Sequence, residues 1–455
     1  MEKGLNNSDI LRFGHFNDNQ IFFIQRWLEV LNSNTHGRYS IKFLNSHQSL
    51  REVVSICEGI INGDIKQNDI HIQLAIEEAR SIVDKDKLFE RESNTYYKIV
   101  ARCLQSVPKA TQTPKLYSII YQLRYVIEHL DTFYLEWIVE RLKLLLFDND
   151  YTCKKEMKNL DEINNLILNL VSELLGKGWS VKRLYELIKE DLLQQQDDTQ
   201  KWDKFISSIM KEVETYTCIF RFKSLPKQTL QEKMIQLNLD LLYGRSILET
   251  YSDSQLSSHI SSGQPYLRVI ISAYDQHSAI NSAWFQIAEK LNVLRFYGYS
   301  IPEISKAAIV IGPDGKTFSR NIQVSLLSGI KKFKAPDILI DRIRDQLNKS
   351  DEVSINRKIK SLFEFNRISE ESLSPQSAFL NLWIALESFV QTKEREGGID
   401  NVKMVVGTTT SYNYIYSLVK NFVEDCDRCM LEINLEKGKI IKIGKLNVYE
   451  AIAFF

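Results

Sequence analysis

The amino-acid sequence predicts a mainly helical protein with a small mixed α/β insert. Three observations support this prediction. Apolar residues recur at three- and four-residue spacing through most of residues 1–212, short β-branched and aromatic runs bounded by turn residues appear in residues 213–334, and helical spacing returns in residues 335–455. We therefore expect an N-terminal helical domain, a central mixed α/β domain and a C-terminal helical domain with these boundaries.

The N-terminal domain is expected to contain about six to eight helices. Helical spacing is clearest in residues 50–61, 70–83, 116–147 and 160–175. The first of these should stop at Asn62-Gly63-Asp64, because glycine readily takes the left-handed conformation that ends a helix. The last should stop at 176–178, and Ser180 should then cap a helix over 181–193, because its hydroxyl can accept a backbone N–H of the first turn.

The central domain is expected to combine strands with one amphipathic helix. Residues 216–222 and 267–274 have the β-branched and aromatic character of strands. A helix over 279–296 should follow, capped by Asp275 or Ser278. The runs 307–311 and 317–324 flank Gly312-Pro313-Asp314-Gly315, a sequence typical of a tight turn, and so predict a hairpin.

Helical patterns resume in the C-terminal domain. We expect helices over residues 338–347, 355–365, 378–390 and 412–422. Ser374-Pro375 should open the third of these, because proline is tolerated in the first turn. The last residues mix lysine and isoleucine without a clear period and end on an apolar segment, 451–455.

Composition limits the compartment and the kinds of partner. The chain has 455 residues, with 58 basic and 58 acidic side chains, so charge alone would not hold it on nucleic acid or on an anionic membrane. The first residues lack the apolar core of a secretory signal, and no stretch approaches the ~20 apolar residues needed to span a bilayer. Six mostly scattered cysteines fit a reducing cytoplasm. We therefore expect a cytoplasmic protein.

Arg124 and His129 are the candidate catalytic pair. They are separated by four residues, as in metal-independent sites that cut RNA, where histidine acts as acid or base and arginine stabilises the phosphate charge. In a regular helix, however, such a pair lies about 140° apart around the axis. A solvated arginine and a half-buried histidine on a long helix are the simpler interpretation, so the catalytic residues stay unknown.

Other motifs have structural explanations. Gly315-Lys316-Thr317 resembles the end of a phosphate-binding loop, but the required first glycine is replaced by Val310, which favours a plain hairpin. Cys426 and Cys429 have metal-ligand spacing, but no second Cys or His pair lies nearby. Asp275 and His277 lie where helix capping accounts for them. We expect no cofactor and no metal.

Basic side chains gather in the C-terminal third. Residues 331–367 contain ten basic and six acidic side chains, and a second cluster is formed by Lys437, Lys439, Lys442 and Lys445. These clusters could meet phosphate, although solvated helix faces explain them as well.

Several segments resemble the Apea-like HEPN group of bacterial proteins, over about residues 170–430. The segment 175–185 looks like the family's Lys-Gly helix end followed by a Ser-capped helix, and 217–223 is similar to its first strand. The segments 269–279 and 291–296 look like its strand and following helix. The strongest similarity is Phe379-Leu-Asn-Leu-Trp-Ile-Ala-Leu-Glu-Ser-Phe389, which resembles the opening of the HEPN helical domain.

The resemblance implies a cytoplasmic, homodimeric ribonuclease of antiviral defence, with RNA as substrate and an unidentified phage or host trigger. The family's catalytic Arg–His motif would lie after Leu380, but this sequence has no histidine beyond His277. Two interpretations stay open: the chain stops before its catalytic helix, or the domain is a non-catalytic relative that binds or dimerises. Because Arg124 and His129 lie in a different domain, the family's roles are not transferred to them.

Overall fold

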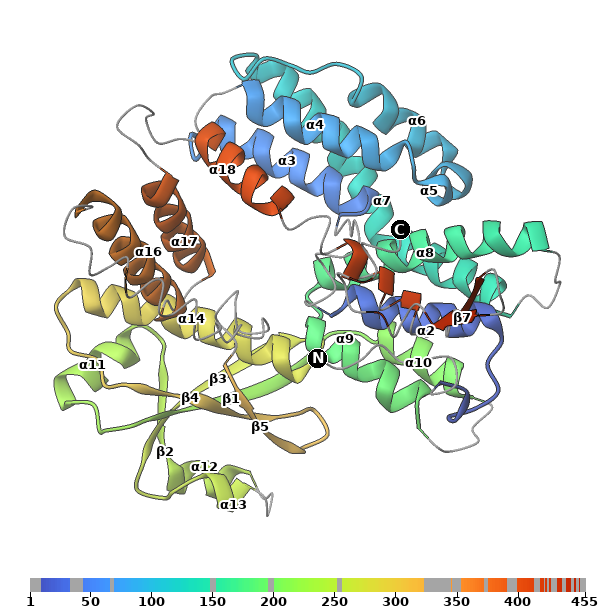
Figure 1. The fold of residues 1–455 in the computed structure, drawn as a ribbon. Helices are drawn as coiled ribbons and strands as arrows, with labels where there is room; N and C mark the ends of the chain where they lie inside the picture. The colour runs from blue at the N-terminus through green and yellow to red at the C-terminus, as the bar shows by residue number, and fades with distance from the viewer. Residues whose placement is uncertain are drawn as a thin grey trace. The chain divides into compact units, whose positions relative to one another are not determined.

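The computed structural model describes residues 10–32, 44–65, 69–147, 153–194, 200–251, 256–322, 353–371, 375–390 and 399–412, with short pieces at 345 and between 418 and 450. The chain is mainly helical and carries a small antiparallel sheet, which confirms the predicted fold class (Figure 1). It divides into two compact units, Met1–Glu212 and Val213–Phe455. The first predicted boundary falls at the same place. The second, at 334/335, lies outside the described residues.

The first unit is helical throughout its described residues. Its α-helices are α2 (Asp18–Val30), α3 (Ser46–Asn62), α4 (Asp69–Val83), α5 (Lys87–Glu92), α6 (Asn94–Cys103), α7 (Thr113–Leu146), α8 (Cys153–Lys177), α9 (Val181–Leu187) and α10 (Lys201–Ile209). The described part of this unit thus holds at least nine helices against the six to eight expected, because a short helix such as α5 spans too few residues to show a clear apolar period.

The 34-residue helix α7 organises this unit, because α3, α6 and α8 all pack against it. Its apolar positions are buried along most of its length, as the 3.6-residue period requires. Helix α3 ends as predicted at Gly63, whose φ of 81° is the left-handed conformation that favours glycine.

The helix predicted over 181–193 is present but changes type midway. Ser180 caps it, since the Ser180 hydroxyl accepts the Arg183 backbone N–H at 3.1 Å. After Leu187 the chain forms a π-helical turn, η1 (Ile188–Leu192), which ends with a bond from Leu193 N to Ile188 O. Such single π-turns are uncommon, and the apolar pattern does not reveal them.

The second unit contains a five-stranded antiparallel sheet. Its strands are β1 (Glu214–Phe222), β2 (Asp240–Tyr243), β3 (Pro265–Ala273), β4 (Ile304–Ile311) and β5 (Thr317–Asn321), in the order β2-β3-β1-β4-β5. β1, β3 and the β4–β5 hairpin were predicted. β2 was not, because only four residues form it and both its central side chains are only partly buried.

One face of the sheet packs against helix α14 (Gln276–Phe296), which crosses it in Figure 1. Alternate residues of β1, including Cys218, Phe220 and Phe222, point into this core together with Trp284 of α14. The opposite face carries Ile219 and Tyr266. They are covered by residues of α12 (Gly244–Thr250) and α13 (Leu256–His259). A further helix, α11 (Gln228–Gln236), precedes β2.

The C-terminal part of this unit contains three further described helices. They are α16 (Val353–Glu371), α17 (Pro375–Val390) and α18 (Ile399–Tyr412). α16 and α17 pack side by side, and the Ser369 hydroxyl donates a hydrogen bond to Ala378 O at 2.9 Å. The predicted proline start of α17 is confirmed at Pro375.

Helix α18 was not predicted, because its valines and threonines have low helix propensity and contacts with α17 override it. The helix expected over 412–422 is helical at its described residues, 412, 418–420 and 422, while 413–417 and 421 lie outside the described part of the chain. Most of the helix expected at 338–347 also lies outside it. The last segment, which lacked a clear pattern, contains a short hairpin, β6 (Glu432–Leu435) and β7 (Lys439–Lys442).

Substitution of Asp275 tests the start of α14. We expect Asp275→Ala to lower the free energy of unfolding by about 0.5–2 kcal/mol, because the carboxylate accepts backbone N–H groups of the first turn. Urea unfolding followed by circular dichroism measures this. Asp275→Asn, which preserves the capping oxygen, should retain most of the stability. If both variants lose the same amount, charge rather than capping is the cause.

Candidate functional site

His129 lies on the outer side of α7 among other rings. Its imidazole stacks on Tyr96 of α6, with the ring centroids 3.9 Å apart and the planes 3° from parallel. Its Nε2 lies 3.1 Å from the Ser93 hydroxyl. Partial burial lowers the pKa of His129 below its ordinary value, so the ring is neutral at neutral pH.

Arg124 faces a different neighbour. It forms an ion pair with Glu58 of α3, whereas His129 contacts residues in and next to α6. The two side chains therefore point to different helices and do not line one site, as the helical geometry indicated. Nothing in this arrangement assigns them a catalytic role, and that role stays a prediction.

Asp275 and His277 form the start of α14. The Asp275 carboxylate accepts the backbone N–H of His277 at 2.8 Å and of Ser278 at 3.0 Å, and Asp275 N donates back to the Ser278 hydroxyl at 3.2 Å. This reciprocal capping box agrees with the structural interpretation of the pair.

The Gly-Lys-Thr motif lies at an exposed hairpin tip between β4 and β5. Gly315 has a φ of 76°, and its N–H donates to Gly312 O at 3.0 Å, which closes the turn. Lys316 lies 2.8 Å from the Asp314 carboxylate. Because a strand rather than a helix follows, the motif does not build a phosphate loop.

The cysteines offer no reactive centre where they are described. Cys426 is buried and packs with Val423, while Cys429 lies outside the described residues. Burial raises the pKa of Cys57 to about 11 and that of Cys218 to about 12, so both remain protonated thiols at neutral pH. Within the described part of the chain, no group of three or more Cys, His, Asp or Glu is placed to hold a metal ion.

The basic clusters are only partly described. Lys439 and Lys442 lie on β7, and residues 353–367 of the first cluster lie in α16. Residues 331–344, Lys437 and Lys445 lie outside the described residues. Among the helices that the structure describes, none combines the length and the apolar character needed to cross a membrane.

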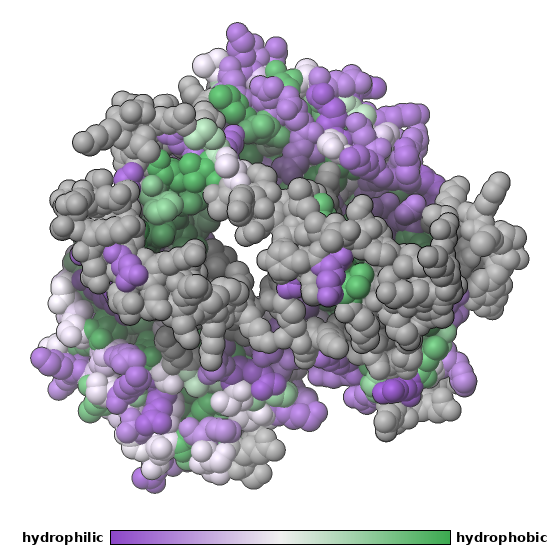
Figure 2. Space-filling view, in the orientation of Figure 1, coloured by the Kyte–Doolittle hydropathy of each residue, from purple (hydrophilic) through white to green (hydrophobic). Residues whose placement is uncertain are grey.

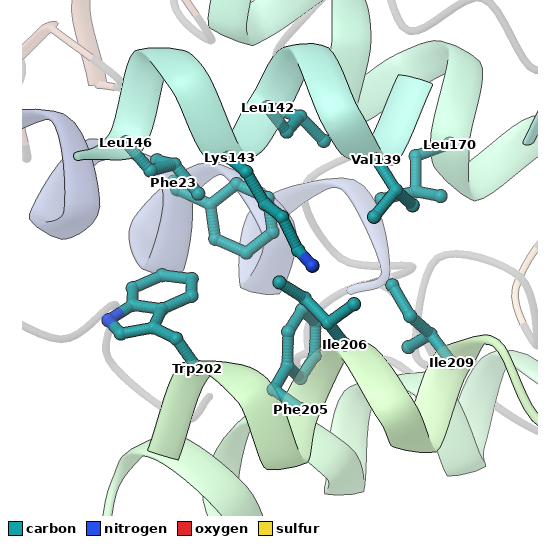
Figure 3. A pocket seen from close by; sticks show the side chains of 10 residues that line it. All are labelled: Phe23, Val139, Leu142, Lys143, Leu146, Leu170, Trp202, Phe205, Ile206 and Ile209. Atoms are coloured by element: carbon teal, nitrogen blue, oxygen red, sulfur yellow. The ribbon is translucent and has the colours of Figure 1, made fainter. Parts of the chain in front are cut away.

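A small pocket lies in the first unit between α2, α7, α8 and α10 (Figure 3). It is lined by Phe23, Val139, Leu142, Lys143, Leu146, Leu170, Trp202, Phe205, Ile206 and Ile209. Lys143 is the only charged residue of this lining and extends across it in Figure 3. Because the lining does not bring several polar groups together, we interpret the pocket as a gap in the packing and not as a catalytic site.

Sequence analysis missed a buried polar cluster in the first unit. It joins the starts of α3 and α5 to α7 and α8, and consists of Asn45, Ser46, His47, Asp86, Tyr134, Ser172 and Glu173. Every one of these side chains is buried, and Glu173 has no exposed surface. A buried charge is costly unless it is paired, so their contacts decide whether these helices can pack.

His47 and Glu173 are the centre of the polar cluster. His47 Nδ1 lies 3.1 and 3.0 Å from the two carboxylate oxygens of Glu173. Asn45, which caps α3, donates its side-chain amide to Glu173 Oε2 at 3.2 Å. Burial would raise the pKa of Glu173, but these two partners and the charge of Lys177 outweigh it, so the pKa is lowered and Glu173 is ionised.

Asp86 forms the second half of the polar cluster. Its Oδ2 accepts hydrogen bonds from the Tyr134 hydroxyl at 2.5 Å and the Ser46 hydroxyl at 2.7 Å, and its Oδ1 accepts the Phe89 N–H at the start of α5. Burial, followed by the charge of Asp86, raises the pKa of Tyr134 well above its ordinary value. Tyr134 therefore remains a hydrogen-bond donor.

The polar cluster reaches solvent only at its edge. His47 Nε2 lies 3.2 Å from both Arg51 Nε and an Asp131 carboxylate oxygen, and these two residues are about half exposed. Because both ring nitrogens of His47 are engaged and the ring is buried, no substrate can reach it. Two sequence signals could have revealed the polar cluster. One is the pair Ser172-Glu173 between apolar residues of α8, and the other is Asn45-Ser46-His47 at the start of α3.

Helix α17 has apolar side chains at the surface of the second unit. Phe379 and Leu380 of α17 are 62% and 56% exposed, and Phe389 of the same helix is also exposed. Phe363 of the adjacent α16 is exposed as well. Hydrophobic surface gathers in Figure 2 where Figure 1 places α17. Glu387 is the only charged residue of α17. A helix that is apolar on nearly all sides is normally buried against other parts of a protein.

Comparison with known proteins gives no relative of this chain. No family model matches it, no curated protein matches it, and no solved structure matches it. The resemblance to the HEPN group therefore stays a prediction.

The polar cluster makes stability depend on pH. We expect Glu173→Gln to lower the free energy of unfolding at pH 7 by about 1–3 kcal/mol, because an amide cannot replace both carboxylate oxygens that face the buried His47 and Asn45. The pKa of Glu173 is lower in the folded protein than its ordinary value of 4.5, so its contribution is complete above pH 4.5 and is lost as the pH falls through the lowered pKa. The difference between the two proteins should thus shrink in acid.

Urea unfolding at several pH values measures this dependence. The exposed Glu78→Gln, also on a helix of this unit, is the matched control and should change the stability little at any pH. A Glu173→Gln deficit that stays constant down to pH 3 would show that Glu173 is not ionised in the folded protein.

Proposed function

We propose that this chain acts as a homodimer assembled through α16 and α17, as a HEPN-type module of a cytoplasmic, RNA-directed antiviral system. The observation that carries the proposal is the exposed apolar surface of α17, in the segment that resembles the opening of a HEPN helical domain. HEPN domains work in pairs, and a second copy would supply the cover that this helix lacks.

The energetics of such a pairing are favourable. Burying one exposed Phe or Leu side chain contributes about 1.5–3 kcal/mol, and a two-fold interface buries each residue twice. Around α17, Phe379 lies about 100° from Leu380 and about 80° from Phe389, whereas Leu380 and Phe389 lie on opposite sides of the helix. A partner helix centred between Phe379 and Leu380 can therefore contact those two side chains together. Most of the affinity would come from these few side chains, as is usual for interfaces.

For the chain in hand, we favour the non-catalytic form of the module over the ribonuclease. Catalysis of the HEPN type needs an arginine and a histidine in the same cleft, and no histidine follows His277. The candidate pair, Arg124 and His129, contacts different helices. The proposed role is therefore dimerisation and binding within a larger defence assembly, with RNA as the molecule on which that assembly acts.

Leu380→Glu tests the dimer. We expect the wild-type chain to sediment as a dimer at micromolar concentration and the variant as a monomer, because two carboxylates would be buried in the interface. Gln236→Glu, at an exposed polar position of α11 outside the proposed interface, adds the same charge and should leave the dimer intact. A wild-type monomer, or equal effects of both variants, would contradict the proposal.

Incubation with labelled single-stranded RNA tests the absence of catalysis. We expect the purified 455-residue chain to leave the RNA intact on a denaturing gel, because Arg124 and His129 contact different helices, and His47, which does contact Arg51, is buried. Cleavage that persists in wild type and disappears in His129→Ala would instead assign hydrolysis to His129 and overturn the non-catalytic role.

A further inference from the structure

A row of aromatic rings lies along the solvent side of the first unit. It is formed by every fourth residue of α7, joined by one tyrosine of α6, and we call it the aromatic face: Tyr96, Tyr117, Tyr121, Tyr125, His129, Phe133 and Trp137. The four-residue spacing places successive rings one turn apart on the helix surface. The proposed dimer through α17 does not use this face.

Four of these rings, Tyr117, Tyr121, Tyr125 and Phe133, are exposed although they are large, and Tyr96, His129 and Trp137 are half-buried. Tyr121 and Tyr125 are 68% and 57% exposed, and Phe133 is 40% exposed. Single exposed apolar residues are common, but a contiguous exposed patch marks an interaction surface. Tyrosine and tryptophan are also the residues that contribute most to binding in interfaces.

The rings hold one another in place. Tyr96 stacks on His129 and also on Tyr125, with the two tyrosine hydroxyls 3.3 Å apart. Phe133 lies 5.0 Å from His129 between ring centroids and stacks with Trp137 at 6.2 Å. These contacts already restrict the conformations of the rings. Binding of a ligand would therefore cost little conformational entropy of these side chains.

Carboxylates follow the same face. Glu128, Glu136 and Glu140 come three residues after Tyr125, Phe133 and Trp137, and residues three apart are neighbours on a helix surface. All three are exposed, and within the described residues none of them forms an ion pair. The neighbouring arginines are engaged elsewhere, Arg124 with Glu58 and Arg141 with Glu162.

The charge of this surface identifies its partner. Ring faces and carboxylates both attract cations, and the neutral His129 adds no opposing charge. A nucleic acid is disfavoured, because residues 1–212 have 31 acidic and 28 basic side chains and phosphates would meet the glutamates. The complementary ligand is a positively charged, extended segment whose side chains can lie over rings.

We propose that the aromatic face binds a basic, arginine- or lysine-rich segment of a partner protein. The guanidinium or ammonium groups lie over Tyr125, Phe133 and Trp137, and the three glutamates pair with them. Electrostatic attraction to the glutamates steers the approach, and the stacked rings supply the contact area. Arginine suits this surface best, because its planar group can stack on a ring and donate to a carboxylate at the same time.

Fluorescence anisotropy with a labelled peptide of six Arg-Gly repeats tests the proposal on the full chain. We expect Glu128→Gln/Glu136→Gln/Glu140→Gln to weaken binding about tenfold at low salt, and Tyr125→Leu/Phe133→Leu to weaken it about fivefold with no change of charge. The control Glu52→Gln/Glu77→Gln/Glu78→Gln removes the same charge from exposed positions of α3 and α4 and should change binding less than about twofold.

Two further ligands separate the alternatives. A citrulline version of the peptide, which keeps the shape but lacks the charge, should not bind, and a 12-nucleotide uridine RNA should bind no better to wild type than to the aromatic variant. Circular dichroism checks that each variant is folded. The proposal is overturned if the wild-type chain does not bind the arginine peptide, if the control triple variant loses as much affinity as the face variants, or if the face binds RNA in its place.

Discussion

The first unit depends on the buried contact between His47 and Glu173. Glu173 lies in an otherwise apolar stretch of α8, so α8 can pack only if a partner compensates the buried charge. The start of α3 supplies that partner in His47 and a second donor in Asn45. Tyr134 and Asp86 extend the same polar contacts to α7 and α5. Because each group needs the others, the register of these four helices is fixed together.

The buried polar contacts also determine which residues of α7 face outward. Tyr134 and Leu130 point inward, so the helical period turns Tyr125, His129 and Phe133 outward. The glutamates three residues later share that side. The aromatic face is therefore a consequence of how α7 is held by its buried residues. The second unit follows a different rule, since α14 and the alternating residues of β1 form its core by apolar contact alone.

Local signals predicted much of the fold. Gly63, Ser180 and Asp275 end or begin helices as expected, because capping involves only a few neighbouring residues. The short helix α5 and the strand β2 were missed because they span too few residues to show a period, and α18 was missed because its residues have low helix propensity. The polar cluster was missed for a different reason, since its members His47 and Glu173 are 126 residues apart.

For the candidate sites, the sequence correctly gave structural explanations for the Gly315-Lys316-Thr317 hairpin and for Asp275 with His277. It could only propose Arg124 and His129 as a pair. Their separation on α7 was predictable from the helical period, but their partners, Glu58 and Tyr96, come from other helices.

The sequence by itself determined the mainly helical class, the change to strands after residue 212 and the absence of histidine beyond His277. These features follow from residue type and local spacing. Only the tertiary structure decided which polar residues are buried together, which rings of α7 remain outside and that the apolar helix α17 is incompletely covered. The physical reason is that burial depends on what packs against a residue, and those neighbours lie far away along the chain.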